Sequence, residues 1–260
     1  MENYNLRDFQ LRLLELLRLV DGVCRQHQLT YYIEAGTLLG AVRHKGFIPW
    51  DDDIDILMPR PDYDLLMAHA EEWLPRPLYM MTGRYSKGYH HAFAKVVDGG
   101  THLVERGIPM GLYVDIFPVD GMTSCRLVQR FHVLWYRYVT KKMLYFCCRE
   151  PYKHGRGPSC WWPLLCRRLY GYDRAHRAIE RMQRRYDYAT HEMTIDHDFN
   201  LAGIMPRSVL GKPTEIEFEG VLFYGPEHPE EYLSRVYGPD YMTPPPPEQR
   251  RVHYFQDVTF

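Results

Sequence analysis

Four carboxylates lie within five positions of this chain, at Asp51, Asp52, Asp53 and Asp55. Crowded carboxylates repel each other and lose hydration as they approach a protein core, so this cluster is unfavourable without a neutralising cation. Hard cations such as Mg²⁺ prefer oxygen ligands and often bind substrate phosphates as well. The cluster therefore indicates a site for Mg²⁺ or Mn²⁺, and the alternative is a solvated acidic loop.

Apolar neighbours favour a buried strand over that loop. Three large aliphatic residues alternate with the acids or follow them: Ile54, Ile56 and Leu57. Alternate side chains of a strand point to the same face of a sheet. We therefore expect Asp51, Asp53 and Asp55 to share one face. Asp52 is then directed away from that face, unless a bulge changes the register, and the two isoleucines point into the core.

A single further aspartate, Asp115, interrupts an apolar and aromatic run at 112–117. In isolation it would fit a hydrogen-bonded core aspartate or the end of a strand. With an acidic strand earlier in the chain, we interpret it as a third metal carboxylate.

The pair Gly36-Thr37 lies between a β-rich run at 31–34 and a helix-like run at 38–43. A turn that opens a helix offers free backbone N–H groups to a phosphate. Gly-Thr pairs also occur in ordinary turns, so Gly36-Thr37 indicates a phosphate site only in combination with the acids that follow it. Four cations are candidate partners of bound phosphates, although solvated side chains are the alternative: Arg43, His44, Lys45 and Lys95.

Hydrophobic periodicity outlines the rest of the chain. It predicts helices at 5–27, 62–73 (with Asp62 as N-cap), 126–147, 173–189 and 230–237, and β structure at 78–117 and 218–224. No repeat or flexible linker divides the 260 residues. The pattern predicts a single α+β domain over 1–260 that includes a helical insertion at about 125–190.

The insertion is basic and aromatic. Residues 125–185 hold 15 Lys and Arg against three acids, although the whole chain carries a net charge of −1. Such helices can lie on an anionic membrane, bind a polyanionic substrate or nucleic acid, or form a solvated basic face. No nucleic-acid motif accompanies the charge, so nucleic acid is not expected; peripheral contact with an anionic membrane is one possible function of this segment, and a solvated basic face is the equally weighted alternative.

Six cysteines are present without CxxC spacing. Four of them allow a Zn²⁺ site, for which buried free thiols are the commoner alternative: Cys125, Cys147, Cys148 and Cys160. The polar N-terminus and the lack of a long apolar run predict a cytoplasmic protein, at most peripheral at the inner face of the membrane.

Several motifs together resemble the LicD family, in order over roughly 5–255. They are Gly36–Gly40, Gly46–Asp55, Val114–Pro118 with Asp120-Gly121, Phe218–Gly220 and the ending from Tyr237 to His253. The family includes phosphorylcholine transferases of the nucleotidyltransferase-fold superfamily and is similar to the fukutin-type ribitol-phosphate transferases. The resemblance implies a mixed sheet flanked by helices.

The resemblance also implies site residues and an activity. Asp53, Asp55 and Asp115 would be the catalytic metal-binding acids, and Asp51 would be an additional ligand or a supporting residue. Gly36-Thr37 would hold a phosphate, and His253 is a possible substrate contact or a structural histidine. The implied reaction moves a phospho-alcohol, first of all phosphocholine from CDP-choline, to a sugar hydroxyl and releases CMP.

The implied acceptor is a cell-surface glycan such as lipopolysaccharide, teichoic acid or capsule, or its lipid-linked precursor. Ribitol, glycerol or another alcohol remains an alternative cargo. A nucleotidyltransferase acting on a sugar phosphate or small molecule is one alternative function. A noncatalytic protein that binds glycans or a membrane surface is another, although the intact acid cluster argues against it.

Overall fold

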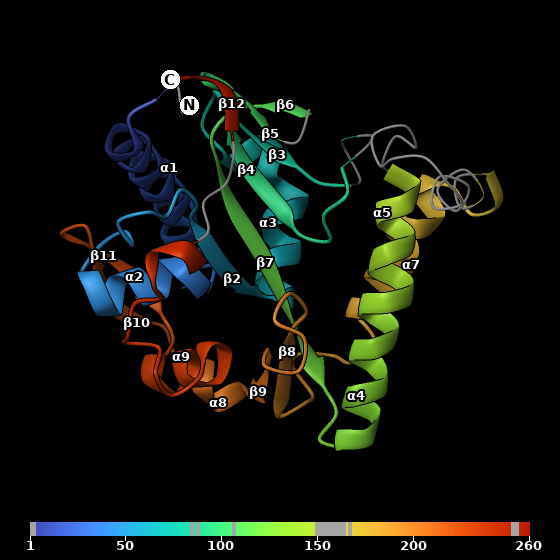
Figure 1. Ribbon diagram of the computed structural model, residues 1–260. Coiled ribbons are helices and arrows are strands. Elements are labelled where there is room, and N and C mark those ends of the chain that lie inside the picture. Colours follow the sequence, from blue (N-terminus) through green and yellow to red (C-terminus); the bar gives the residue numbers. More distant parts are fainter. Residues whose placement is uncertain are drawn as a thin grey trace. The chain divides into compact units, whose positions relative to one another are not determined.

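The computed structural model describes residues 4–83, 86, 89–105, 108–148, 165, 168–250 and 255–260 (Figure 1). The chain forms two compact units. The first comprises Met1–Met80, Lys95–Val119 and Met205–Phe260, and the second comprises Met81–Ala94 and Asp120–Ile204. The expected insertion falls within the second unit, and the expected α+β class is confirmed.

The first unit contains the sheet that carries the acids. Its elements up to the central strand are α1 (Leu6–Gln26), β1 (Tyr32–Ile33), α2 (Ala35–His44), β2 (Asp55–Pro59), α3 (Arg60–Trp73), β3 (Leu78–Met81), β4 (Ala94–Asp98), β5 (His102–Glu105), β6 (Ile108–Met110) and β7 (Tyr113–Met122). The C-terminal part adds α8 (Arg207–Leu210), β10 (Thr214–Phe218), β11 (Val221–Gly225), α9 (Pro229–Tyr237), a 3₁₀ turn at Pro247–Gln249 and β12 (Phe255–Thr259).

The main sheet has the strand order β1-β2-β7-β4-β3. β2 is antiparallel to β1 and parallel to β7. Ile56, Leu57 and Met58 are all buried, as expected for a parallel strand covered on both faces. Both α2 and α3 contact β2, so the strand that begins at Asp55 lies at the centre of this unit.

The helix limits follow local signals, with one correction. α1 confirms the helix expected at 5–27, and its N-cap Asn5 accepts a hydrogen bond from the Arg7 amide at 2.8 Å. Asp62 is not the N-cap of α3: the helix starts at Arg60, after Pro59, and Asp62 lies in its first turn. Proline fits the start of a helix because the first amides lack intrahelical acceptors, so Pro61 allows this earlier start.

The second unit is built mainly from helices. It contains α4 (Arg126–Trp135), a π-helical turn at Tyr136–Lys141, α5 (Lys142–Cys148), α7 (Tyr172–Gln183) and β8 (Met193–Asp196), and β9 (Ile204–Pro206) begins at its last residue. The helical run 126–148 matches the expected helix, whereas α7 ends earlier than the expected 189. Tyr136 and Leu144 of that run pack with Ala175 and Ile179 of α7 in a small core.

Among the described residues, none of the helices combines the length and the apolar character that crossing a bilayer requires.

Candidate active site

The acidic segment enters the sheet later than a continuous strand would. Residues 51–54 are not in a strand, and β2 begins at Asp55. Carboxylate oxygens of Asp51, Asp52 and Asp53 lie within 4.8 Å of one another. The expectation that Asp52 points away is therefore wrong, because strand alternation does not apply before Asp55. Asp52 is also buried.

Asp55 and Asp115 bring a fourth and a fifth carboxylate to this place. They are register partners on the adjacent parallel strands β2 and β7, so their side chains share one face of the sheet. The Asp115 amide donates a hydrogen bond of 2.9 Å to the carbonyl of Ile54, which fixes the register beside the acids. The structure thus places the two expected strand acids side by side.

The electrostatics reflect this crowding. Burial, followed by the charges of Asp53 and Asp115, raises the pKa of Asp55 well above its ordinary value. Burial also raises the pKa of Asp115 to about 7, and the nearby Lys95 opposes that rise. In the metal-free protein, burial thus shifts both groups toward protonation, and a cation would favour the ionised forms.

Lys95 lies beside Asp115 and is almost fully buried. Its Nζ is 2.7 Å from Oδ1 of Asp115 and 3.8 Å from Oε2 of Glu105, and it sits 3.3 Å from the ring centroid of Tyr113. Glu105 also accepts a hydrogen bond from the Tyr113 hydroxyl at 3.3 Å. The cation expected to meet phosphate is thus already engaged with acids, and Glu105 and Tyr113 are functional neighbours that sequence reasoning missed.

The start of α2 meets the acidic segment. A Cβ built on Gly36 would lie 2.7 Å from Oδ2 of Asp51, so glycine permits the close approach of that carboxylate. The Thr37 hydroxyl accepts a hydrogen bond of 2.9 Å from the Asp55 amide. Thr37 therefore positions the start of the acid-bearing strand β2 through its side chain. The first amides of α2 have no acceptor within the helix and remain suited to a phosphate.

The other three predicted cations lie at the opposite end of α2. Arg43 donates a 2.9 Å hydrogen bond to the carbonyl of Tyr241 and another, of 3.0 Å, to His44. Lys45 is the exposed C-cap of the helix. Because α2 rises about 1.5 Å per residue, Lys45 is roughly 12 Å along the axis from Thr37. Burial lowers the pKa of Arg43 and of His44.

Contacts from α1 hold the loop that precedes the acids. Gln10 donates a 2.8 Å hydrogen bond to the carbonyl of Asp51. Glu219, in the turn between β10 and β11, accepts hydrogen bonds from Arg7 at 2.6 and 2.9 Å and from the Phe47 amide at 3.1 Å. A Cβ on Gly46 would collide with the Glu219 carboxylate, so a larger residue there would displace this side chain from the loop. Three distant segments therefore converge on the acidic loop.

Tyr237, at the end of α9, is another neighbour that sequence reasoning did not assign to the site. Burial and then the charges of Asp55, Asp51, Glu34 and Asp53 raise the pKa of its hydroxyl. In the sequence, Tyr237 was noted only as the start of the C-terminal motif that resembles the LicD family. This hydroxyl adds a hydrogen-bonding group close to the carboxylates.

Two further predictions concern residues that are described only in part. His253 lies outside the described residues, as does Cys160, and the side chain of Cys148 is not described. Cys125 is exposed and Cys147 is buried. These two thiols flank the helical run 126–148, roughly 33 Å apart at 1.5 Å per residue, so they cannot bind the same ion.

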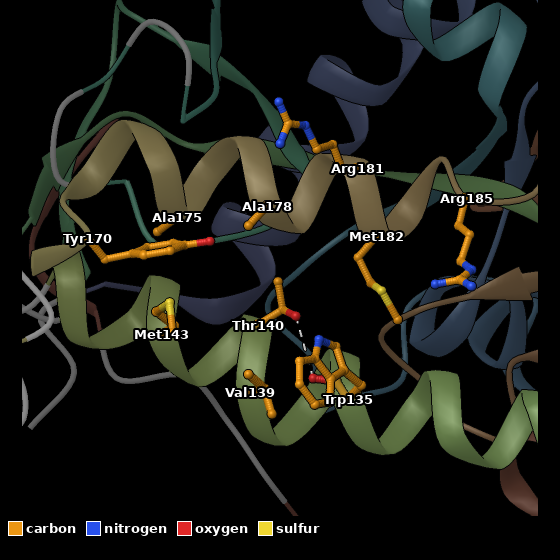
Figure 2. Close-up of a pocket in the computed structure, with 10 residues that line it drawn as sticks. All are labelled: Trp135, Val139, Thr140, Met143, Tyr170, Ala175, Ala178, Arg181, Met182 and Arg185. Atoms are coloured by element: carbon orange, nitrogen blue, oxygen red, sulfur yellow. Dashed lines mark hydrogen bonds between the residues drawn. The ribbon is translucent and has the colours of Figure 1, made fainter.

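The second unit has a cavity of its own, between α7 and the helical run 126–148 (Figure 2). Trp135 and Tyr170 lie toward opposite ends of the cavity, and Thr140 donates a hydrogen bond to the Trp135 carbonyl. Its lining includes Arg181 and Arg185 but no carboxylate. This cavity therefore lacks ligands for a hard cation, and the candidate active site is the acid cluster.

The donor set fits Mg²⁺ or Mn²⁺. All candidate ligands in the cluster are carboxylate oxygens, and a hard cation prefers oxygen. The three converging carboxylates of Asp51, Asp52 and Asp53 are the group whose distances suit a shared ion among the described residues. Asp55 and Asp115 stand next to them as additional anionic ligands or as proton acceptors.

Carboxylates presented from two adjacent parallel strands, beside the start of a helix, define a nucleotidyltransferase-type site. Residues 28–146 match the family described as "LicD/FKTN/FKRP, nucleotidyltransferase domain". All five acids of the cluster lie within this range. The resemblance to the LicD family is thereby confirmed.

Individual relatives agree with this assignment. The chain is 27% identical over 266 residues to the lipopolysaccharide cholinephosphotransferase LicD of Haemophilus influenzae, and the similarity covers 99% of each chain. An uncharacterised protein of Rickettsia prowazekii is 37% identical over 83 residues, which cover 32% of this chain and 29% of that protein. Human ribitol 5-phosphate transferase FKRP is 48% identical over 42 residues, 16% of this chain and 8% of FKRP.

Proposed function

We propose that this protein is a metal-dependent transferase that moves a phospho-alcohol from a CDP-activated donor to a sugar hydroxyl of a glycan. The observation that carries the proposal is the side-by-side placement of Asp55 and Asp115 next to the converging Asp51, Asp52 and Asp53. The full-length similarity to a cholinephosphotransferase supports phosphocholine as the cargo. CDP-choline is the donor that we propose for it.

The chain supplies three functions to this reaction. The first amides of α2 bind the donor diphosphate, next to the acid that approaches Gly36. The carboxylates hold a cation, which when bound neutralises the diphosphate and stabilises the leaving oxygen. Thr37 and Gln10 keep the acidic segment in place through hydrogen bonds to its backbone.

Proton transfer is assigned to Asp115. Its raised pKa of about 7 suits a group that must accept a proton near neutral pH. The acceptor hydroxyl gives its proton to Asp115 while its oxygen bonds to the phosphorus of the phospho-alcohol. The bond from that phosphorus to the bridging oxygen breaks, and CMP leaves. Lys95, 2.7 Å away, holds the carboxylate in position.

The acceptor is assigned to a surface glycan or its lipid-linked precursor. Lipopolysaccharide is the acceptor named for the Haemophilus relative. FKRP, a ribitol 5-phosphate transferase, shares only a short segment, so ribitol phosphate is a second possible cargo. The test donors therefore include CDP-choline, CDP-ribitol and CDP-glycerol.

The test measures CMP release from each donor with glycan acceptors, in the presence of Mg²⁺, Mn²⁺ or a chelator. We expect release from one donor that requires the cation and is lost in Asp55→Asn. Release of pyrophosphate from CTP, with no CMP from any CDP-alcohol, would instead identify a nucleotidyltransferase. Cation-independent CMP release would contradict the assignment of the carboxylates.

A further inference from the structure

The surface of α4 and the π-helical turn that follows it carries large apolar side chains in contact with solvent. Leu127 is 77% exposed, Phe131 64% and Leu134 55%. Val128, Trp135 and Tyr138 are exposed as well. In contrast, His132, Val133 and Tyr136 of the same run are buried. The helix therefore has one apolar side that is used for packing and a second apolar side that is not.

The exposed apolar residues form a continuous stripe. At 3.6 residues per turn they occupy roughly 120° of the helix surface, from Leu134 through Leu127 and Phe131 to Val128. The buried residues lie on the opposite side of the helix. We call the exposed group, Leu127, Val128, Phe131, Leu134, Trp135 and Tyr138, the apolar stripe. Trp135 is at its edge and is half-exposed, and it also lines the cavity beside α7.

Cations flank this stripe on one side. Arg126, Arg130 and Arg137 are exposed and fall within roughly 40° of one another at 100° per residue. None of these three forms an ion pair with a described acid. The whole run 126–148 contains Lys141 and Lys142 in addition, and no aspartate or glutamate. An exposed apolar stripe next to a row of uncompensated arginines is the pattern of a helix that lies in a membrane interface.

The row of arginines beside the apolar stripe also distinguishes between possible binding partners of this surface. An antiparallel symmetric pair of this chain would place the same surface against itself and bring the two rows of arginines together, and a parallel pair would leave both rows without a partner of opposite charge. Nucleic acid would match the charge but would leave six large apolar side chains against a polar partner. An anionic bilayer satisfies both features, because the phosphates attract the arginines and the acyl region receives the apolar side chains.

We propose that α4 and the adjoining π-helical turn dock this protein on an anionic lipid bilayer, with the apolar stripe inserted below the headgroups. The arginine row lies at the headgroup level, and the buried side of the helix keeps its contacts within the second unit. The stripe is thus a membrane-docking surface. Because the proposal concerns lipid binding in the absence of donor and acceptor, it stands or falls independently of the proposed transfer reaction.

Vesicle flotation of the full chain tests the proposal. Vesicles of phosphatidylcholine are compared with vesicles that also contain phosphatidylglycerol, at low and at high salt. We expect the protein to float with the anionic vesicles at low salt and to be partly released by salt. Replacing the stripe by Leu127→Ser, Phe131→Ser and Leu134→Ser should lower vesicle affinity by about tenfold or more.

A matched control replaces three leucines that are exposed on helices of the first unit, Leu11→Ser, Leu19→Ser and Leu65→Ser. It should bind vesicles like the unchanged protein, and thermal melting should show that both triple variants fold. Each arginine-to-alanine change at 126, 130 or 137 should lower affinity for anionic vesicles by roughly fivefold at low salt.

Several outcomes would overturn the proposal. One is the absence of binding to anionic vesicles at low salt, and another is equal binding by the stripe variant and the unchanged protein. Equal loss in the control triple would show that the effect is not specific to this face. Light scattering that finds a dimer dissociated by the stripe variant, without vesicle binding, would assign the face to self-association.

Discussion

A Cβ on Gly36 would lie 2.7 Å from Oδ2 of Asp51, so the backbone at the start of α2 and the first acid of the cluster are in close contact. Gly36→Ala should push the Asp51 carboxylate away and lower both Mg²⁺ affinity and turnover. Stability should change little, since alanine favours the helix while only a side-chain oxygen must move. Isothermal titration with Mg²⁺ and a thermal melt measure the two effects.

Gly22 in α1 provides the matched control, because a Cβ there would meet no atom within 4 Å. Gly22→Ala should stabilise the protein by up to about 1 kcal/mol and leave Mg²⁺ binding unchanged. If Gly36→Ala retains full Mg²⁺ affinity, the close approach of Asp51 has no functional meaning.

The paired strand acids yield a second prediction. Asp55→Asn or Asp115→Asn should abolish transfer and weaken Mg²⁺ binding. The metal-free Asp55→Asn variant should melt no lower than the unchanged protein, because the substitution removes a charge from a crowded group. Asp115→Asn should melt lower, because it removes the ion-pair partner of the buried Lys95. Asp240→Asn, at an exposed acid outside the cluster, should leave activity and metal binding unchanged. A fully active Asp55→Asn variant would remove the acid cluster from the mechanism.

These acids also make stability depend on pH in a defined direction. The folded pKa of Asp115 is about 7, above the ordinary carboxyl value, and that of Asp55 is raised too. Between roughly pH 4 and pH 7 the folded state retains a proton that the unfolded state has released. The metal-free protein should therefore lose stability as pH rises through this window.

Mg²⁺ should reverse that loss, because it favours the ionised carboxylates that the metal-free fold disfavours. The melting temperature should increase more on adding Mg²⁺ at about pH 8 than at about pH 5. Melting in chelator and in Mg²⁺ at both pH values measures the difference. An equal increase at both would show that these carboxylates are not the ligands.

How much of this site the sequence could predict depended on the range of the interactions. The juxtaposition of Asp55 and Asp115 followed from single acids inside apolar runs, since such runs become buried strands. The orientation of Asp52 was mispredicted because the alternation was extended four residues before the strand begins. A local departure from strand geometry leaves no clear signal in the residue types.

The supporting residues were beyond prediction for a different reason. Glu105 meets Lys95 only after β4, β5 and β7 have taken their places in the fold, and Tyr237 reaches the acids from a helix more than a hundred residues away in sequence. Side chains such as these look like ordinary surface residues in the sequence. Their roles arise from tertiary packing, which one sequence without homologues does not specify.

Lys95 gives a fourth prediction. Lys95→Met removes the buried cation that neutralises Asp115 and Glu105, and should lower stability by about 3–5 kcal/mol at neutral pH. The substitution should also shift the acidic limb of the pH–rate profile to higher pH, because Lys95 opposes the rise of the Asp115 pKa. Adding Glu105→Gln to the variant should recover part of the lost stability. Urea unfolding and a pH–rate profile measure these effects.

Lys141→Met is the control for that substitution. Lys141 also pairs with an acid, Asp198, at 2.6 Å, but both side chains are over 40% exposed, so its loss should change stability by less than about 1 kcal/mol. A Lys95→Met protein that unfolds at the same urea concentration as the control would show that the buried ion pair contributes nothing to stability.

The last prediction concerns the contact between Glu219 and the loop that leads to the acids. Glu219→Ala removes the acceptor of the Phe47 amide and the partner of Arg7, so stability should fall by about 1–3 kcal/mol. Turnover should fall as well, because residues 46–50 lead directly into the acid cluster. The hydrogen bond from Arg7 lowers the pKa of Glu219, so this stabilisation is present above the ordinary glutamate pKa and is lost as pH falls below it.

Glu215→Ala is the control that distinguishes loss of the contact between Glu219 and the Phe47 amide from a general loosening of the β10–β11 hairpin. Glu215 of β10 also pairs with an arginine of α1, Arg25 at 2.8 Å, whereas the hydrogen bond from the Phe47 amide is accepted by Glu219. Replacing Glu215 should leave turnover and Mg²⁺ affinity unchanged. If both variants reduce turnover equally, attachment of the hairpin to α1 matters and the specific contact with Phe47 does not. If only Glu219→Ala reduces turnover, the hydrogen bond from the Phe47 amide to Glu219 positions the acid cluster.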